Sequence, residues 1–319
     1  MVLWLFFIGV FLMLINNIIT VSTQVAILFI IVFIGFFANK SKIFSAGTIK
    51  EITNFVLYIV VPCTVVNSYC REFDMHMLKL LLISIGAAAI SFLIYGIIAG
   101  MIIKDKDENR QRVLRFGAVF SNAGFMAFPL LEAILGPIGL FFGAAYTSVF
   151  NIVVWTYGKI LMGGTRKDIT LRSVFVNPGV IGTVAGVIVF VCSVSLPPII
   201  HEPIRYMASL NTPLPMLILG YQLANSKFNI RGLSVYISLF MKHFLMPALM
   251  LIGLYLCGIT GDVLVAMVIS VSAPSATMTS MFAQKFNPSA TSVAASYVSI
   301  SMILSVITMP VMIGISMLL

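Results

Sequence analysis

The protein has 319 residues, of which 60% are apolar and 9% are charged, and its formal net charge is +9. A soluble domain carries about 25% charged residues, so the composition excludes a protein whose surface faces mainly water. The apolar residues form continuous runs of about 20, the length that crosses roughly 30 Å of hydrocarbon as a helix. The strands of a membrane barrel would instead alternate over about 10 residues. The sequence therefore predicts an all-α polytopic membrane protein.

Ten segments are expected to span the membrane. In chain order they are 17–37, 49–69, 78–103, 113–134, 138–162, 177–195, 206–225, 232–257, 262–285 and 289–317. They divide the chain into an N-terminal apolar extension (1–16), a first five-helix unit (17–162), a cytoplasmic linker (163–176) and a second five-helix unit (177–319). The extension lacks the basic start and the cleavage site of a signal peptide. It is interpreted as an additional span, an interfacial helix, or residues that precede a start at Met13.

The basic residues predict how these segments are oriented. If the loop after the first segment lies in the cytoplasm, 15 of the 19 Lys and Arg residues fall on that side. The opposite side holds Arg71, Lys79 and Arg205, and Lys242 lies inside the eighth segment. This asymmetry follows the positive-inside rule and predicts a multi-pass protein of the plasma membrane with both termini outside. The positive charge is explained by topology, so no nucleic-acid partner is expected.

The two five-helix units share residues at a constant spacing. Four pairs of identical residues lie 151 positions apart: Pro62 and Pro213, Pro137 and Pro288, Tyr146 and Tyr297, and Ser148 and Ser299. Because five is an odd number of spans, the second unit must be inverted relative to the first. Inverted repeats are typical of secondary transporters, whose substrate site lies near mid-membrane at the repeat interface.

Helix-breaking residues lie in the middle of the fourth and ninth spans. The fourth contains Ser121-Asn-Ala-Gly-Phe-Met-Ala-Phe-Pro129, and the ninth contains Ser270-Val-Ser-Ala-Pro-Ser-Ala-Thr277. Proline removes a backbone donor and glycine weakens a helix. A break in lipid is tolerated only where it contacts protein, water or ligand, and two half-helices can point positive N-terminal ends at an anion.

These breaks supply the candidate substrate-binding residues, which are Asn122, Gly124, Pro129, Ser272, Pro274, Ser275 and Thr277. The amide of Asn122 both donates and accepts hydrogen bonds, so it can bind a carboxylate or a freed backbone group. The alternative is that Asn122 caps a helix and that each break is an ordinary proline kink with small residues for helix packing.

Several motifs follow one another in a characteristic order: Pro62, Asn122 seven residues before Pro129-Leu130-Leu131, Tyr146 to Trp155 with Asn151 between, Asn177-Pro178, Pro213-Leu-Pro215 with Leu219-Gly220, and Ser272-Ala-Pro274. In this order and spacing, the chain from about residue 17 resembles the auxin efflux carrier family. That family includes plant auxin exporters and bacterial carboxylate permeases. The resemblance implies two crossed broken helices, a scaffold, a mobile subdomain that moves like an elevator, and a homodimer.

The sequence departs from the plant members of that family in two places. Its linker at 163–176 is short, as in bacterial relatives, and no acidic or basic residue lies between Ile83 and Met101 in the third span. Plant members carry a charged pair there, so any coupling role of that pair is not carried over.

Three polar residues inside other spans are further candidates. Lys242 and His243 lie well inside the eighth span, and Asn151 lies in the fifth. A charge within the membrane is costly and is by default a functional hypothesis, so the three are interpreted as a source of charge or of ion coupling. The alternatives are a lysine that reaches the membrane surface or a backbone carbonyl, and a histidine that satisfies a local hydrogen bond.

The sequence contains no P-loop, metal-binding cluster, paired carboxylates or catalytic triad in a plausible site. An enzyme, an ATP-driven pump, a cofactor and a bound metal are therefore not expected. The prediction is a secondary active transporter of a small organic anion, a mono- or dicarboxylate such as malate, with H⁺, Na⁺ or no coupling ion. The alternatives are an auxin-like or other small-solute exporter of the same fold, and a passive channel.

Overall fold

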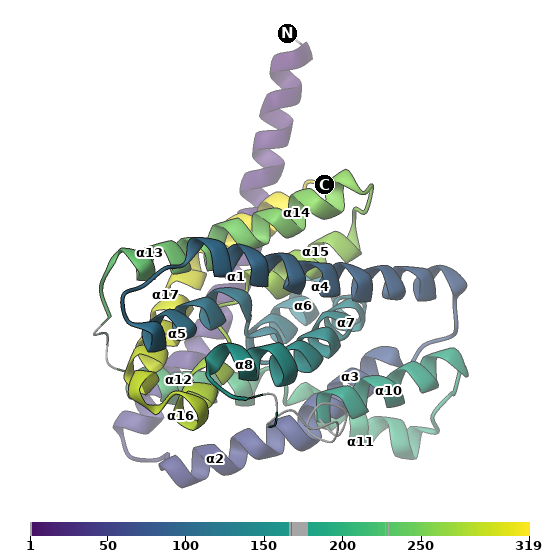
Figure 1. Cartoon of the computed structure of the whole chain (residues 1–319). Helices are drawn as coiled ribbons and strands as arrows, with labels where there is room; N and C mark the ends of the chain where they lie inside the picture. Colours follow the sequence, from purple (N-terminus) through teal and green to yellow (C-terminus); the bar gives the residue numbers. More distant parts are fainter. Residues whose placement is uncertain (1, 166, 168–177, 227, 229) are drawn as a thin grey trace.

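The computed structural model describes residues 2–165, 167, 178–226, 228 and 230–319, with side chains from residue 9 onward. Over this part of the chain every regular element is a helix (Figure 1). Asn177 and most of the predicted linker lie outside the described residues. The predicted all-α membrane class is confirmed, because six helical segments are long and apolar enough to cross a membrane: Gly9–Lys40, Ala46–Tyr69, Met75–Ile102, Pro137–Met162, Leu233–Leu256 and Pro288–Ser316.

The elements of the two halves are α-helices joined in places by short π- or 3₁₀-helical turns, labelled η. Those of the first half are α1 (Val2–Lys40), α2 (Ala46–Phe55), η1 (Val56–Val60), α3 (Val61–Tyr69), α4 (Met75–Ile102), α5 (Glu108–Val119), η2 (Ala123–Ala127), α6 (Phe128–Leu135), α7 (Pro137–Val153), η3 (Val154–Gly158) and α8 (Lys159–Met162). Those of the second half are α10 (Pro178–Val191), α11 (Pro198–Ser209), α12 (Pro213–Ala224), α13 (Leu233–Phe240), η5 (Met241–Leu245), α14 (Met246–Leu256), α15 (Asp262–Ser272), α16 (Met278–Phe286), η6 (Pro288–Ala290) and α17 (Thr291–Ser316).

Four of the ten predicted spans differ from a single long helix. The fourth and ninth are interrupted, the sixth is the shorter helix α10, and the seventh is divided between α11 and α12. The division falls before Pro213, which starts α12. Proline is accommodated in the first turn of a helix but breaks its interior. An apolar run therefore predicts membrane residence correctly while overstating the length of the helix.

Helix α1 continues without interruption through the predicted boundary at residue 16. Its N-terminal turns project beyond the other helices, and both chain termini lie toward the same end (Figure 1). Nearer its C-terminus, α1 packs closely on α12. A Cβ at Gly35 would lie 2.4 Å from the Leu217 carbonyl oxygen, and one at Gly220 would lie 2.0 Å from that of Val32. Two glycines thus set the distance between these helices, as small residues do in membrane bundles.

Three helical segments contain a π-helical turn that ends two residues before a proline. The pairs are Val56–Val60 with Pro62, Ala123–Ala127 with Pro129, and Met241–Leu245 with Pro247. Each proline lacks the N–H that would bond the carbonyl four residues earlier, and that carbonyl lies within the widened turn. Such turns are frequent at functional sites. One of the three begins directly after Asn122, and another contains Lys242 and His243.

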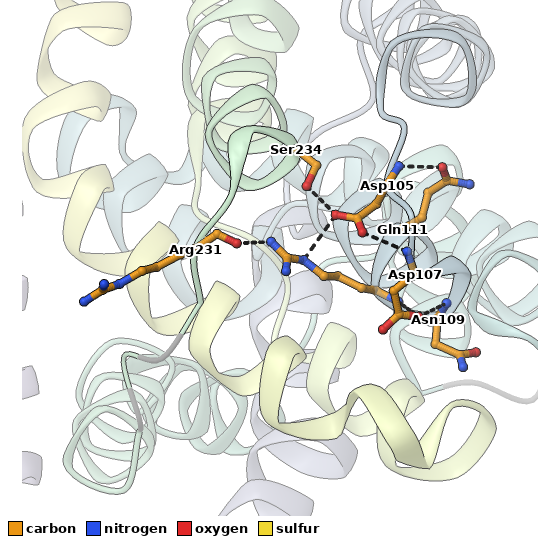
Figure 2. Close-up of polar contacts among 7 residues, drawn as sticks. Asp105, Asp107, Asn109, Gln111, Arg231 and Ser234 are labelled. Atoms are coloured by element: carbon orange, nitrogen blue, oxygen red, sulfur yellow. Dashed lines mark hydrogen bonds and ion pairs between the residues drawn. The ribbon is translucent and has the colours of Figure 1, made fainter.

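The loop between α4 and α5 is fastened to the start of α13 (Figure 2). Ser234 donates a hydrogen bond to Asp105, Arg110 Nε lies 3.2 Å from Asp105 Oδ2, and Arg110 Nη2 donates to the Arg231 carbonyl. Partial burial by itself raises the pKa of Asp105, but hydrogen bonds from Ser234 and the Asp107 amide, with the Arg110 charge, hold that pKa below its usual value. The contacts join the first half of the chain to the second.

Candidate functional site

The fourth and ninth spans are both interrupted near their middles. Helix α5 ends at Val119, and a helical path resumes at Ala123 with η2 and α6. Helix α15 ends at Ser272, and α16 begins at Met278. Both breaks predicted from glycine, proline and polar residues are confirmed at the predicted positions. Together, residues 120–123 and 273–277 are called the crossover below.

The local backbone explains where each break falls. Ala273 is extended, with ψ at 147°, because a residue that precedes proline is disfavoured in the α conformation. The next residue, Pro274, also has no N–H to continue the helix. In the other break, Asn122 leaves the helical region with ψ at 59°. Its side chain makes no capping hydrogen bond to the turn that follows, so the helix-capping alternative for this residue is not what the structure shows.

The two breaks are hydrogen-bonded to each other. An isolated antiparallel bridge pairs Ser121 with Ser275. The flanking backbone hydrogen bonds run from Asn122 N to Pro274 O at 2.7 Å and from Ala276 N to Phe120 O at 2.9 Å. Backbone groups that a break frees inside a membrane must find partners, and here each break supplies them to the other.

A cavity of about 160 Å³ lies beside the crossover. Its wall combines crossover residues with α2, η1, α3, α7, η3, α10, α12 and the start of α16, and its polar members are Thr53, Tyr58, Ser121, Asn122, Thr147, Asn151, Trp155, Gln222 and Thr277. No charged side chain of the described residues lines it. Pockets for drug-sized ligands occupy about 300–1,000 Å³, so this cavity suits a smaller solute.

Two helix N-termini face the cavity. The wall includes Asn122 to Phe125, where η2 begins, and Ala276 to Met278, where α16 begins. Neither Asn122 nor Thr277 caps its helix with a side-chain hydrogen bond. The first N–H groups of a helix have no intrahelical acceptor and carry partial positive charge. Both ends therefore make the potential in the cavity more positive.

Two polar side chains on the wall lack a partner. Thr147 Oγ1 and Trp155 Nε1 are buried and have no hydrogen-bond acceptor or donor among the described residues. Leaving a buried polar group unpaired costs about 1–3 kcal/mol, and the indole N–H can only donate. A ligand with acceptor oxygens would satisfy it. Neither of these residues, nor Thr53 or Gln222, was predicted from the sequence as a site residue. Trp155 ends one of the family motifs, and the other three are marked only by being polar within an apolar run.

The predicted site residues fall into two groups. Asn122, Gly124, Asn151 and Thr277 lie together on the cavity wall. The remaining candidates from the two breaks are buried outside that wall: Pro129, Ser272, Pro274 and Ser275. Pro129 lies in the first turn of α6, and Pro274 and Ser275 form the contact between the breaks. In the second group, Pro274 and Ser275 therefore belong to the crossover itself, whereas Ser272 ends α15 and Pro129 lies in α6.

Lys242 and His243 are buried behind the crossover and do not line the cavity. Lys242 Nζ donates to Ser121 Oγ and, at 3.1 Å, to the Val271 carbonyl. Ser121 itself lines the cavity, so one hydroxyl separates the lysine from the cavity. The alternative of a lysine that reaches the membrane surface does not match this position, whereas a contact with a backbone carbonyl does.

His243 is held by hydroxyl groups of α17. Its Nδ1 lies 2.9 Å from Thr308 Oγ1, and its Nε2 lies 2.9 Å from Ser301 Oγ. The same Ser301 oxygen accepts the Ser275 N–H at 2.8 Å. Both ring nitrogens therefore have partners, and the histidine links α17 to the second break through Ser301.

Long apolar helices, two interrupted helices joined at their breaks and a small polar cavity beside them define a membrane transport protein. Comparison with known proteins supports the same class. Residues 20–313 match the family described as membrane transport protein. The chain belongs to this family, which is the auxin efflux carrier family, and the resemblance stated from the motifs is confirmed. Transporters of this family are normally not enzymes.

A relative in an archaeon is similar over a large part of both chains. The protein is 25% identical over 214 residues to an uncharacterized transporter of Methanocaldococcus jannaschii, and the aligned region covers 63% of this chain and 68% of the archaeal one. The similarity supports transport as the class of activity for a multi-pass membrane protein of this family.

Proposed function

We propose that the protein is a secondary active transporter that carries a small organic anion, a mono- or dicarboxylate such as malate, across the plasma membrane. The observation that carries the proposal is the cavity wall, where two helix N-termini meet neutral polar side chains. A negative group at a helix N-terminus gains about 0.3–1 kcal/mol when exposed and up to about 2 kcal/mol when partly buried. A cation in the cavity would be repelled by the same helix ends, and none of the described wall residues has a carboxylate that would offset this repulsion.

Lys242 adds to this preference for an anion. Its ammonium donates a hydrogen bond to the hydroxyl of Ser121, and Ser121 lines the cavity. Charges interact more strongly in a protein interior than in water because the effective dielectric constant is lower. A carboxylate in the cavity would therefore be attracted by the lysine charge in addition to the helix ends.

Two inverted five-helix repeats and an elevator-type movement belong to the same proposal. Each half of the chain places its interrupted helix fourth among its predicted spans, and the breaks pair in antiparallel fashion. Tyr95 also donates a 2.8 Å hydrogen bond to the carbonyl of Met246, 151 positions later, the spacing of the repeat. The cavity lies between the crossover and α2, α3, α10 and α12. Movement of the crossover past these helices would expose a bound anion to each side in turn, in each subunit of a homodimer.

The test is uptake of labelled malate into proteoliposomes by the wild type, Asn122→Ala and Asn109→Ala. Asn109 is an exposed asparagine near the start of α5 and provides the matched control. A hydrogen bond to a charged group contributes about 1.5–3 kcal/mol, so Asn122→Ala should lower kcat/KM for uptake by roughly tenfold or more. Asn109→Ala should transport like the wild type.

Each contrary result removes a defined part of the proposal. A well-folded wild type without uptake would reject malate and move the test to auxin-like acids and other small solutes. Equal uptake by wild type and Asn122→Ala would remove Asn122 from the site. Flux that neither saturates nor accumulates solute against its gradient would favour the passive channel.

A further inference from the structure

Lys242 connects the two interrupted helices through its ammonium group. The side chain is fully buried. Its Nζ donates to the hydroxyl of Ser121 in the first break and to the carbonyl of Val271, near the C-terminal end of α15. Ser121 Oγ also donates to the same Val271 carbonyl at 3.0 Å. A positive charge is thereby held between one break and the end of the helix that precedes the other.

The oxygens around Nζ are of the kind that bind a small metal cation. The last carbonyls of a helix lack intrahelical donors and carry partial negative charge. In transporters with broken helices, carbonyls at half-helix C-termini coordinate the coupling Na⁺, and Na⁺, like other hard cations, takes oxygen ligands. In this protein the lysine ammonium is bonded to the Val271 carbonyl and the Ser121 hydroxyl.

In the described part of the chain, Lys242 forms no ion pair with a carboxylate. His243 on the same turn is bonded to Ser301 and Thr308. Tyr297 of α17 pairs its hydroxyl with Ser238 at 2.7 Å. The ion pairs formed by the described residues involve other side chains. The ammonium is therefore stabilised by neutral oxygens, as a bound metal cation would be.

We propose that the Lys242 ammonium is a tethered cation that occupies the place of a coupling Na⁺ at the crossover, so that anion transport by this protein does not require Na⁺. The inference rests on the proposed function for its transport readout. In this arrangement the lysine, which is covalently part of η5, supplies the cation at the crossover in place of a bound ion. Binding and release of Na⁺ are then unnecessary, and a Na⁺ gradient does not drive uptake.

Truncation of the lysine should restore a cation site. In Lys242→Ala, Ser121 Oγ and Val271 O lose their cationic donor and a space opens beside them. The next residue, Ser272, has a buried hydroxyl without a partner among the described residues, which makes a further oxygen available at this helix end. In Lys242→Met, the thioether chain fills most of the space, so this variant is the matched control.

Cation binding is measured first, without any substrate. Melting temperatures of the purified proteins are compared in NaCl and in choline chloride of equal concentration. The wild type and Lys242→Met should melt equally in both salts. Lys242→Ala should melt roughly 5 °C higher in NaCl if Na⁺ is present at about 100 times its dissociation constant.

Transport is measured next, in proteoliposomes with labelled malate. Wild-type uptake should be the same in Na⁺ and choline buffers. Uptake by Lys242→Ala should fall by tenfold or more in choline and recover at least threefold in Na⁺ or methylammonium, while Lys242→Met should stay low in all three.

Na⁺-stimulated uptake or Na⁺-dependent melting of the wild type would overturn the inference, and so would unchanged uptake by Lys242→Ala in choline. The wild-type measurements decide the central claim even if Lys242→Ala fails to fold. A wild type that takes up no carboxylate, combined with the expected melting pattern, would reject the proposed function and support the tethered cation.

Discussion

The contact between α1 and α12 leads to a prediction about a single methyl group. A Cβ added at Gly220 would lie 2.0 Å from Val32 O and 2.7 Å from Phe36 N, and these main-chain atoms cannot rotate away. Ordinary contact begins at 3.4 Å, so the two helices would have to separate by roughly 1.4 Å, which weakens the dispersion contacts along their interface. Overpacking costs typically about 1–3 kcal/mol. The gain of about 0.5–1 kcal/mol from replacing glycine by alanine within a helix offsets only part of that cost.

Thermal unfolding of the purified protein measures the effect of Gly220→Ala. Gly253→Ala in α14 is the control, because a Cβ there meets no atom within 4 Å. Subtracting about 0.75 kcal/mol from an overpacking cost of about 2 kcal/mol leaves a net loss of about 1.25 kcal/mol. With about 2–4 °C of melting temperature per kcal/mol, Gly220→Ala should melt roughly 2–5 °C below the wild type. Gly253→Ala should melt at or above the wild type. Equal melting temperatures for the two variants would contradict the steric conflict between α1 and α12.

Asp105→Asn should destabilise the protein near neutral pH by no more than about 1 kcal/mol, because its ion pair is partly exposed. Since the pKa of Asp105 is held below its usual value, the stabilisation is complete above about pH 4 and is lost as pH falls through the lowered pKa. The melting temperatures of variant and wild type should therefore converge as pH falls below the lowered pKa, and a gap that stays constant would contradict this origin. Ser301→Ala should lower stability by about 1–3 kcal/mol because the Ser275 N–H and His243 Nε2 lose their shared partner. The control is Ser209→Ala, at an exposed serine that is hydrogen-bonded within its own helix. Its stability should stay within about 0.5 kcal/mol of the wild type in the same melting experiment. Equal losses of stability in the two variants would show that Ser301 has no special role.

The pairing of the two breaks explains how helices can be interrupted inside a membrane and still line a cavity. The backbone hydrogen bonds between the breaks satisfy groups that lipid could not. The N-terminal ends of η2 and α16 are left facing the cavity. The same residues that hold the breaks together therefore also orient two positive helix ends toward one small volume.

Local chemistry made the breaks predictable from the sequence. Pro274 forces Ala273 into an extended conformation, and the glycine and polar residues around Asn122 weaken the helix of the fourth predicted span. Both effects are local and do not depend on where these segments lie in the fold. The membrane class follows equally directly, because composition alone decides whether a surface can face water. The division between α11 and α12 was not anticipated, since an apolar run does not reveal where its helix stops.

The sequence by itself determined that this chain lies in a membrane, that its fourth and ninth predicted spans are broken, and to which family it is similar. Only the tertiary structure decided which polar side chains surround the cavity. Ser272 and Ser275 lie outside the cavity wall, whereas Thr53 and Gln222 line it. The physical reason is that a break depends on the backbone preferences of a few adjacent residues. The direction in which a side chain points depends instead on how its helix is rotated relative to helices that are distant in the chain.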